Sequence, residues 1–234
     1  MKIFLALIAC LPILVHGWWA NGHMLTAAVA EKRLKEINPY VFDKMNELVT
    51  SINSLTDDRS HTFIECASWP DDIKEDQYNL EIWSVWHYKD IPFLEEGYSP
   101  NSTLYADNNN AAHVLDQAYQ VLSSNGDHIT AEKALFTRYL IHLAGDVHQP
   151  LHAAALFNET FPQGDQGGNK VKIVLLNGTK DFKLHAFWDS GALLVENDTH
   201  KFERPLDKHS LHEVHAYAQG LIDEYGDAVS EQAK

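Results

Sequence analysis

The stretch from Leu140 to His152, LIHLAGDVHQPLH, constrains the fold and chemistry of this chain more than any other. On a helix, His142 and Asp146 stand four residues apart and project from one face. Pro150 is expected to end that helix and to place His152 just beyond the turn. Imidazoles and carboxylates are ligands that Zn²⁺ binds, so the stretch indicates a metal site. The same spacing also fits an ion pair on a helix surface, and the rest of the chain has to decide between the two.

Residues 1–17 have the features of a secretory signal peptide. Met1-Lys2 precedes an apolar run, and small or branched residues stand before a cleavage site at Trp18. The run is shorter than the roughly 20 apolar residues that a membrane span needs. We therefore expect a secreted protein that begins at Trp18 and folds in an oxidising compartment.

The chain is acidic, with a formal net charge of −15. Simple electrostatic capture of nucleic acid normally requires a basic face, which this composition does not favour. If the substrate is a polyanion, bound metal cations have to supply the positive field locally.

The cysteines and the glycosylation sequons indicate which covalent modifications to expect. Cys10 leaves with the signal peptide, so Cys66 is alone and no internal disulfide is expected. Stability must then come from an ordinary hydrophobic core. Sequons for N-glycosylation occur at four asparagines, namely Asn101, Asn158, Asn177 and Asn197.

Hydrophobic periodicity and helix-breaking residues predict a single, mainly α-helical domain over residues 18–234. A short helical stretch is expected at 59–69, closed by Pro70, and a surface loop at 94–109. Asn177-Gly178, between two apolar runs, predicts one small β-hairpin near residues 169–185. The longer expected helices are 20–37, 40–49, 110–124, 130–147, 188–195 and 205–229.

Four other motifs place metal-binding residue types at suggestive positions. Each is weak alone, because a histidine beside aromatic residues is more often a packed core residue. Together with the central stretch they provide enough ligands for more than one zinc ion. The motifs are Trp18–His23, Ala67–Asp71, Trp86–Asp90 and Leu184–Asp189, and their candidate ligands are His23, Asp71, His87, His185 and Asp189.

The order of these five motifs resembles that of the S1/P1 nucleases, trinuclear zinc enzymes that share a fold with bacterial zinc phospholipase C. The resemblance runs from Trp18 to about Val195. In that family the mature chain begins with a tryptophan whose α-amino nitrogen and carbonyl oxygen bind zinc. Here the predicted cleavage precedes a tryptophan that lies five residues ahead of His23.

The resemblance implies three zinc ions and divides their ligands into three sets. Asp71, His87 and His142 hold one ion; the backbone of Trp18 and the ring of His23 hold a second, and Asp146 bridges the two. His152, His185 and Asp189 hold the third. Two cations roughly 3.5–4 Å apart can share a water and lower its pKa to about 7.

The resemblance also implies roles around the metals. Beside Asp71, Lys74 and Asn169 are expected at the scissile phosphate, where they neutralise developing charge. Tyr88 and Asp90 match residues that stack on a base and hydrogen-bond to it, which suits single strands. Other interpretations stay open, namely a solvated Lys74, core packing by Tyr88, a flexible connector at Gly167-Gly168, and a solvated helix face carrying His209, His212 and His215.

These expectations converge on a secreted, glycosylated zinc phosphodiesterase. It would hydrolyse single-stranded DNA and RNA to 5′-phosphorylated products and act on nucleoside 3′-monophosphates. The alternatives are a zinc-dependent phospholipase C and a non-catalytic secreted zinc-binding protein. Because family members continue through further helices, the domain ending at Lys234 is expected to be truncated at its carboxyl end.

Overall fold

The structure, a computed structural model, describes residues 18–74, 80–99, 108–124, 126, 128–178, 181–193 and 202–232. It is mostly helical, as the sequence predicts. The helices are α1 (Ala20–Ile37), α2 (Pro39–Ser51), α3 (Trp69–Asp72), α4 (Ala111–Ser123), α5 (Ala131–Asp146), α6 (Pro150–Ala153), α7 (Leu184–Asp189) and α8 (Lys208–Gln232). The 3₁₀ turns are η1 (Asn53–Leu55), η2 (Asp58–Ser60), η3 (Glu65–Ser68) and η4 (Glu81–His87).

The longer helices begin where the sequence supplies capping residues. The Asn110 side chain accepts hydrogen bonds from the backbone of Ala112 and His113 at the start of α4. Thr130 does the same for Lys133 at the start of α5. These caps satisfy amides that lack a partner within the helix, which fixes the register of each helix start.

Two prolines were expected to end helices and instead begin them. Pro70 lies at the start of α3, and the predicted helix at 59–69 is replaced by the turns η2 and η3. Pro150 begins α6, because α5 has already ended at Asp146. A proline is tolerated in a first helical turn, where its missing N–H is not needed. The helix predicted at 188–195 is likewise wrong in position, since α7 ends at Asp189.

Two small sheets complete the fold. The predicted hairpin is present as β3 (Lys172–Ile173) and β4 (Phe182–Lys183), which pair antiparallel with Ile173 opposite Phe182. A second sheet, which the sequence did not predict, pairs β1 (Ile91–Leu94) in parallel with β2 (Ala154–Phe157). This pairing brings the segment after His87 beside the segment after His152, and Lys89 N donates to His152 O at 2.8 Å.

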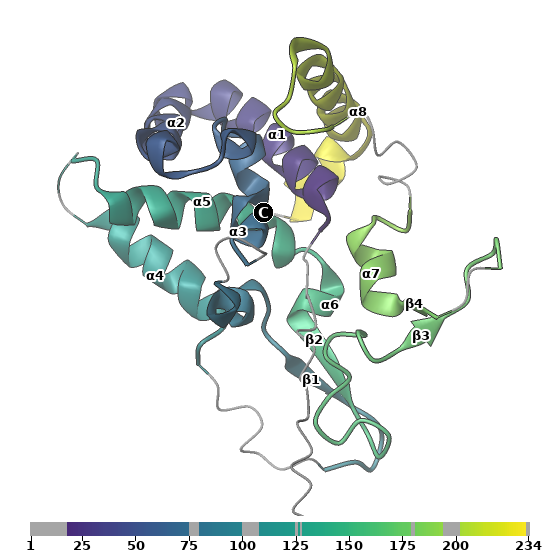
Figure 1. The fold of residues 1–234 in the computed structure, drawn as a ribbon. Coiled ribbons are helices and arrows are strands. Elements are labelled where there is room, and N and C mark those ends of the chain that lie inside the picture. The colour runs from purple at the N-terminus through teal and green to yellow at the C-terminus, as the bar shows by residue number, and fades with distance from the viewer. Residues whose placement is uncertain are drawn as a thin grey trace, which may run out of the picture.

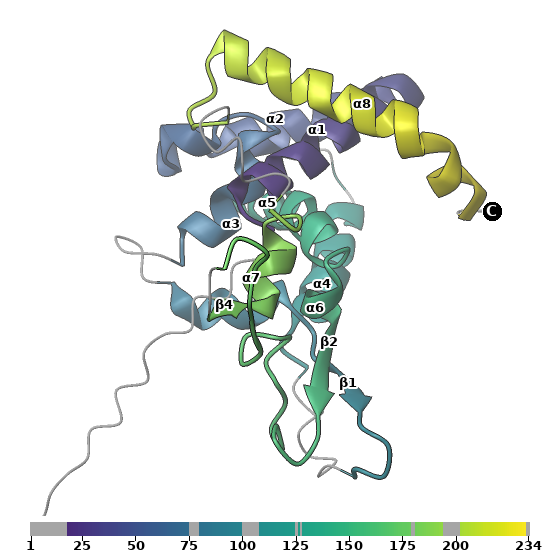
Figure 2. The ribbon, with the colours of Figure 1, turned by 90° about the vertical axis from the view of Figure 1, so that its right-hand side faces the viewer.

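The core lies around α1 and α5, which meet near the centre of the molecule (Figure 1). Helix α8 lies across α1, and the β1–β2 arm points away from the helices on the opposite side (Figure 2). Met24 and Ala28 of α1 pack with Val214 and Ala218 of α8. Leu143 of α5 is fully buried with other apolar residues from α3 and α4. Burial of a leucine side chain stabilises a fold by about 1.5–3 kcal/mol, so these contacts hold the two central helices rigidly.

Among the described residues, the membrane-span criteria of length and hydropathy are met by none of the helices.

Candidate metal centre

The centre is built on one face of α5. His142 and Asp146 are both fully buried, and His142 Nε2 lies 3.0 Å from Asp146 Oδ2. An ion pair on a helix surface would be exposed to water, so that interpretation of the spacing is wrong. The shared face points into the protein, where two charged or polar groups require partners.

Three further side chains converge on this face from distant parts of the chain. His87, at the end of η4, places Nδ1 3.3 Å from Asp146 Oδ2 and 3.4 Å from Asp71 Oδ1. His23 of α1 places Nε2 3.3 Å from Asp146 Oδ1 and 3.6 Å from Asp71 Oδ2. One oxygen of Asp146 therefore faces His23 and the other faces His87 and His142. That arrangement suits a carboxylate that bridges two ions.

A further group of candidate ligands comes from α6 and α7. His185 and Asp189 lie one turn apart on α7, with His185 Nε2 3.4 Å from Asp189 Oδ2. His152 Nε2 lies 3.8 Å from Asp189 Oδ1. The structure thus contains three groups whose ligand atoms lie within 4.8 Å of one another: His23, Asp71 and His142; His87, His142 and Asp146; and His152, His185 and Asp189.

Backbone carbonyls fix the orientation of three of the histidine rings. The Nδ1 atoms of His142, His152 and His185 lie 2.6, 2.7 and 2.7 Å from the carbonyl oxygens of Ala67, His87 and Gly167. A carbonyl oxygen only accepts, so each Nδ1 carries the proton and each Nε2 presents its lone pair to the cluster. This is the tautomer that a metal ligand requires.

The cluster also contains buried polar atoms that no protein group satisfies. Both ring nitrogens of His23, both oxygens of Asp146 and Nε2 of His152 are buried without a hydrogen-bond partner. Such groups cost free energy unless something binds them. The donor set of imidazole nitrogens and carboxylate oxygens fits divalent metal ions of the zinc type.

Two glycines lie close to Trp18 and to the cluster. The Trp18 indole donates to the Gly145 carbonyl at 3.0 Å, and Trp19 N donates to Asp189 O at 3.1 Å. A Cβ on Gly145 would lie 3.0 Å from His23 Nδ1, and one on Gly22 would lie 2.8 Å from Trp18 Cβ. Any larger residue at either position would push Trp18 or His23 away. The role of the Trp18 amine as a ligand stays a prediction.

Burial is the largest influence on the pKa values of the cluster. Burial, and then the charge of Lys74, lowers the pKa of His87 to about 3. Burial also raises the pKa of Asp189 to about 9, against a hydrogen bond from Gln149 that lowers it. For Asp146 burial acts in the same direction, but His142 and His152 outweigh it and hold its pKa well below the ordinary value.

Lys74 is part of the centre. Its side chain is 2% exposed and Nζ lies 2.6 Å from Asp71 Oδ1, so the interpretation of a solvated lysine is wrong. Asn169 is also buried, and its amide donates to Gln166 O at 3.0 Å, which shapes the loop before β3. A contact of Lys74 or Asn169 with a phosphate stays a prediction.

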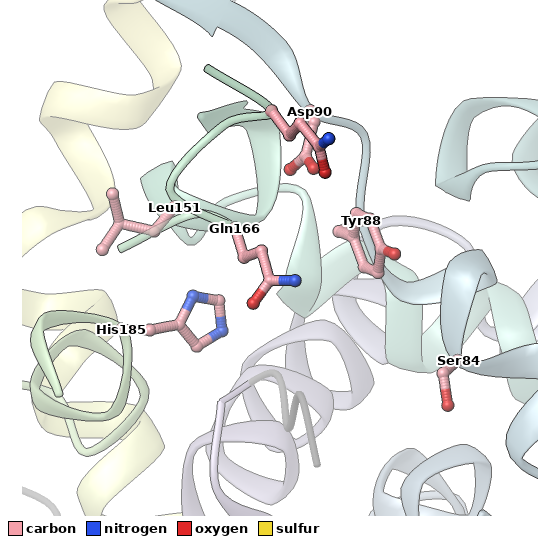
Figure 3. A pocket seen from close by; sticks show the side chains of 7 residues that line it. Ser84, Tyr88, Asp90, Leu151, Gln166 and His185 are labelled. Carbon is pink, nitrogen blue, oxygen red and sulfur yellow. The ribbon is translucent and has the colours of Figure 1, made fainter. Parts of the chain in front are cut away.

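A pocket of about 260 Å³ opens beside the third group of ligands. Tyr88 and Asp90, predicted to bind a base, both line it, and His185 connects it to the metal centre (Figure 3). Burial, and then the charge of Asp165, raises the pKa of Asp90. Within the described residues, the remaining lining consists of Ser84, Leu151, Gln163 and Gln166, so the pocket offers polar hydrogen-bonding groups without a lysine or arginine.

Three residues at the site were not singled out from the sequence. Gln149 donates from Nε2 to Asp189 Oδ1 at 2.6 Å and orients that ligand. The sequence signal that could have identified Gln149 is its position between two histidines of the central stretch. Gln166 and Ser84 line the pocket, and neither lies in a motif that sequence reasoning connects with it. Gln166 has a positive φ of 57°, which is strained for a residue with a side chain.

Other predicted positions lie away from the centre. Asn177 is exposed at the hairpin turn, whereas the Asn158 side chain is half-buried and accepts from Phe161 N at 2.8 Å. Asn101 and Asn197 lie outside the described residues. Of the three histidines expected on a solvated helix face, His209 has a side chain that is 79% exposed, whereas His215 is half-buried with Nε2 3.4 Å from Glu31 Oε1.

The fold and site together define a helical protein with three buried groups of histidine and aspartate side chains that could hold metal ions. The chain belongs to the S1/P1 nuclease family, whose model matches residues 18–234. It is 25% identical to Endonuclease 3 of Arabidopsis thaliana over 92% of this chain and 68% of the relative. It is 26% identical to Endonuclease 4 of the same plant over 84% of this chain and 62% of the relative. The chain thus spans roughly two thirds of the length of these curated relatives.

Proposed function

We propose that the protein is a zinc-dependent phosphodiesterase that cleaves single-stranded DNA and RNA to 5′-phosphorylated products and removes phosphate from nucleoside 3′-monophosphates. The observation that carries the proposal is the convergence of three ligand groups beside a pocket lined by Tyr88 and Asp90. Family membership and the endonuclease names of the relatives support the same chemistry.

Zinc fits the ligands present. Asp71, His87 and His142 would hold one ion, Trp18 and His23 a second with Asp146 shared, and His152, His185 and Asp189 a third. When bound, the ions supply Lewis acidity and a water of lowered pKa. They also supply the positive charge that an acidic chain with a net charge of −15 otherwise lacks at a phosphate site.

The protein residues around the ions bind and orient the substrate. Lys74 adds a cation next to Asp71, and Asn169 adds an amide as the family resemblance implies, so both stabilise charge that develops on a phosphate. Tyr88 provides an aromatic face and Asp90 a carboxyl group for a base. A pocket of about 260 Å³ accepts a base only after it has left the stack, which favours single strands over duplexes.

The test uses the naturally processed protein, beginning at Trp18 and loaded with zinc. Single-stranded DNA, single-stranded RNA, duplex DNA and a nucleoside 3′-monophosphate are incubated with and without chelator. The expected result is cleavage of single strands that a chelator abolishes and zinc restores, with phosphate on the 5′ ends. Zinc-loaded protein that releases no such products would defeat the proposal.

Secretion and glycosylation belong to the same proposal. The predicted signal peptide at 1–17 lies outside the described residues, and Asn177 is the exposed sequon among those described. Amino-terminal sequencing of secreted protein is expected to begin at Trp18. Treatment with a glycosidase that removes N-linked sugars is expected to lower its mass.

One observation favours lipid head groups as a second candidate class of substrate. The sequence showed no obvious apolar membrane-facing stretch, but β1 exposes Ile91, Phe93 and Leu94 at 52, 68 and 44%. Exposed apolar side chains on a projecting arm are compatible with contact to a lipid surface. Hydrolysis of phosphatidylcholine faster than of an oligonucleotide would favour a phospholipase C instead.

A further inference from the structure

A buried ion pair ties the segment before α8 to the helix that carries Asp71. The Arg204 guanidinium donates from Nη1 and Nη2 to the two oxygens of Asp72, at 2.7 and 2.8 Å. A third bond runs from Nη1 to the Arg59 carbonyl at 3.2 Å. The Arg204 side chain is 8% exposed and that of Asp72 is 19% exposed. Such a bidentate arrangement fixes the direction of both groups, which a single hydrogen bond does not.

A second contact lies two residues further along the chain. Leu206 N donates to Glu65 Oε1 at 2.6 Å, and the other oxygen of Glu65 accepts from the Thr62 hydroxyl at 2.7 Å. Phe202, just ahead of Arg204, is buried with Met24 of α1. Residues 202–206 are therefore held against both ends of the segment that runs from η2 to α3.

That segment requires such support because it has little regular structure. Helix α3 is four residues long and is preceded by 3₁₀ turns. A helix this short is not stable by itself, since few of its hydrogen bonds are internal. Yet α3 supplies Asp71, and Lys74 lies two residues after its last residue. Asp72 is the neighbour of Asp71, so fixing the Asp72 carboxylate also fixes the backbone from which Asp71 projects.

We propose that Arg204 is a positioning residue for the metal centre, which holds α3 through Asp72 so that Asp71 and Lys74 face the other ligands. Arg59 does not replace it, because its Nη2 lies 3.9 Å from Asp72 Oδ1 and its side chain is 47% exposed. Buried ion pairs are weak sources of net stability, but they specify orientation when their geometry is bidentate. The inference rests on the proposed function only in taking zinc as the metal.

The test compares Arg204→Gln, Arg204→Lys and Asp72→Asn with the wild type, all in the full processed chain. Arg33→Gln is the matched control, because Arg33 forms an exposed ion pair with Glu36 at 3.4 Å. Zinc affinity is measured by competition with a chromophoric chelator, and the absorption spectrum of the cobalt(II)-substituted protein reports the ligand geometry. Unfolding of the metal-free proteins is measured separately.

Loss of groups that orient metal ligands typically lowers affinity about 10- to 100-fold, and we expect a loss in this range for Arg204→Gln and Asp72→Asn. Arg204→Lys keeps the positive charge but loses the bidentate guanidinium. Its zinc affinity is expected to lie between those of Arg204→Gln and the wild type. The cobalt spectrum should change in these variants and stay unchanged in Arg33→Gln. Asp72→Asn nearly preserves shape, so it provides the result if the arginine variants do not fold.

Wild-type zinc affinity and an unchanged cobalt spectrum in Arg204→Gln or Asp72→Asn, with only a lower unfolding temperature, would overturn the inference. Because the readouts are zinc affinity and the cobalt spectrum, a failure of the proposed function can be distinguished from a failure of this inference. A wild-type protein that binds zinc without cleaving nucleic acid defeats the function and leaves the positioning role to be decided by the same titration. A wild-type protein that binds no zinc overturns both.

Discussion

At the scale of the residue, the surrounding protein opposes the charged form of some side chains of the centre. Asp189 is the clearest case, because burial raises its pKa from 3.8 to about 9 in the metal-free protein. A bound dication reverses this preference, since it stabilises the carboxylate. The same residue therefore opposes folding without metal at neutral pH and supports folding with it.

The raised pKa of Asp189 predicts that the stability of the metal-free protein depends on pH. Between pH 3.8 and about 9 the unfolded chain releases a proton that folded, metal-free protein retains on Asp189, so the stability of that form falls as the pH rises. The variant Asp189→Asn removes this group, and its metal-free stability is expected to fall less over the same range. Urea titrations at several pH values measure the difference.

The control for this prediction is the zinc-loaded protein. Zinc displaces the proton, so its stabilising effect on the wild type should grow with pH and should be smaller in Asp189→Asn. Equal pH profiles for the two metal-free proteins would contradict the account given for Asp189.

At the scale of the element, α5 connects the site to the rest of the core. Four residues before His142, Arg138 is fully buried and donates to the carbonyls of Ser60 and Val49 at 2.9 and 2.8 Å, and to Asn53 Oδ1 at 3.0 Å. Its guanidinium also lies 5.3 Å from the centre of the Trp69 ring. This one side chain thus joins α5 to the ends of α2 and η2.

Replacement of Arg138 by methionine is expected to destabilise the fold. The substitution would leave buried hydrogen-bond acceptors without donors, and each unsatisfied group costs about 1–3 kcal/mol. We therefore expect the free energy of unfolding to fall by about 3 kcal/mol. Lys172→Met is the control, because its ion pair with Asp181 is 66 and 73% exposed and should contribute under about 1 kcal/mol. Equal unfolding midpoints in urea would refute this role for Arg138.

Sequence reasoning found elements whose signals are local. Apolar periodicity and helix-breaking residues located α1, α4 and α5 to within a few residues, and Asn177-Gly178 located the hairpin. It misjudged Pro70 and Pro150, because a proline is compatible with either end of a helix and only the tertiary structure decides. It missed the β1–β2 pair, because two four-residue strands some 60 residues apart carry no local signal of pairing.

The candidate site shows the same limit. The spacing of His142 and Asp146 predicted a shared face. The grouping of His23 and His87 with that face, and of His185 with His152, came from the family resemblance. Arg204 and Gln166 escaped notice because their roles depend on contacts across the fold or on a strained backbone angle.

At the scale of the whole molecule, Trp18 and Trp19 lie beside the candidate metal centre. Trp18 and Trp19 are held by the carbonyls of Gly145 and Asp189, which places the predicted cleavage point beside the ligands. If the Trp18 amine binds zinc, any residue retained ahead of it should remove zinc and abolish cleavage of single strands. The measurements are zinc content by elemental analysis and activity.

The control for that prediction carries the same tag after Lys234 and should keep both zinc and activity. A protein with an added amino-terminal tag that is fully loaded and fully active would show that the amine is not a ligand.

The depth of the ligands has a consequence for how the protein acquires its ions. His142 and Asp146 are inaccessible to solvent, and His152, His185 and Asp189 are at most 3% exposed. An ion held by His142 and Asp146 is therefore expected to exchange slowly, because it would leave only through local opening of the chain around it. If the protein binds zinc, the metal supply present while the chain folds is then expected to decide which ions it holds.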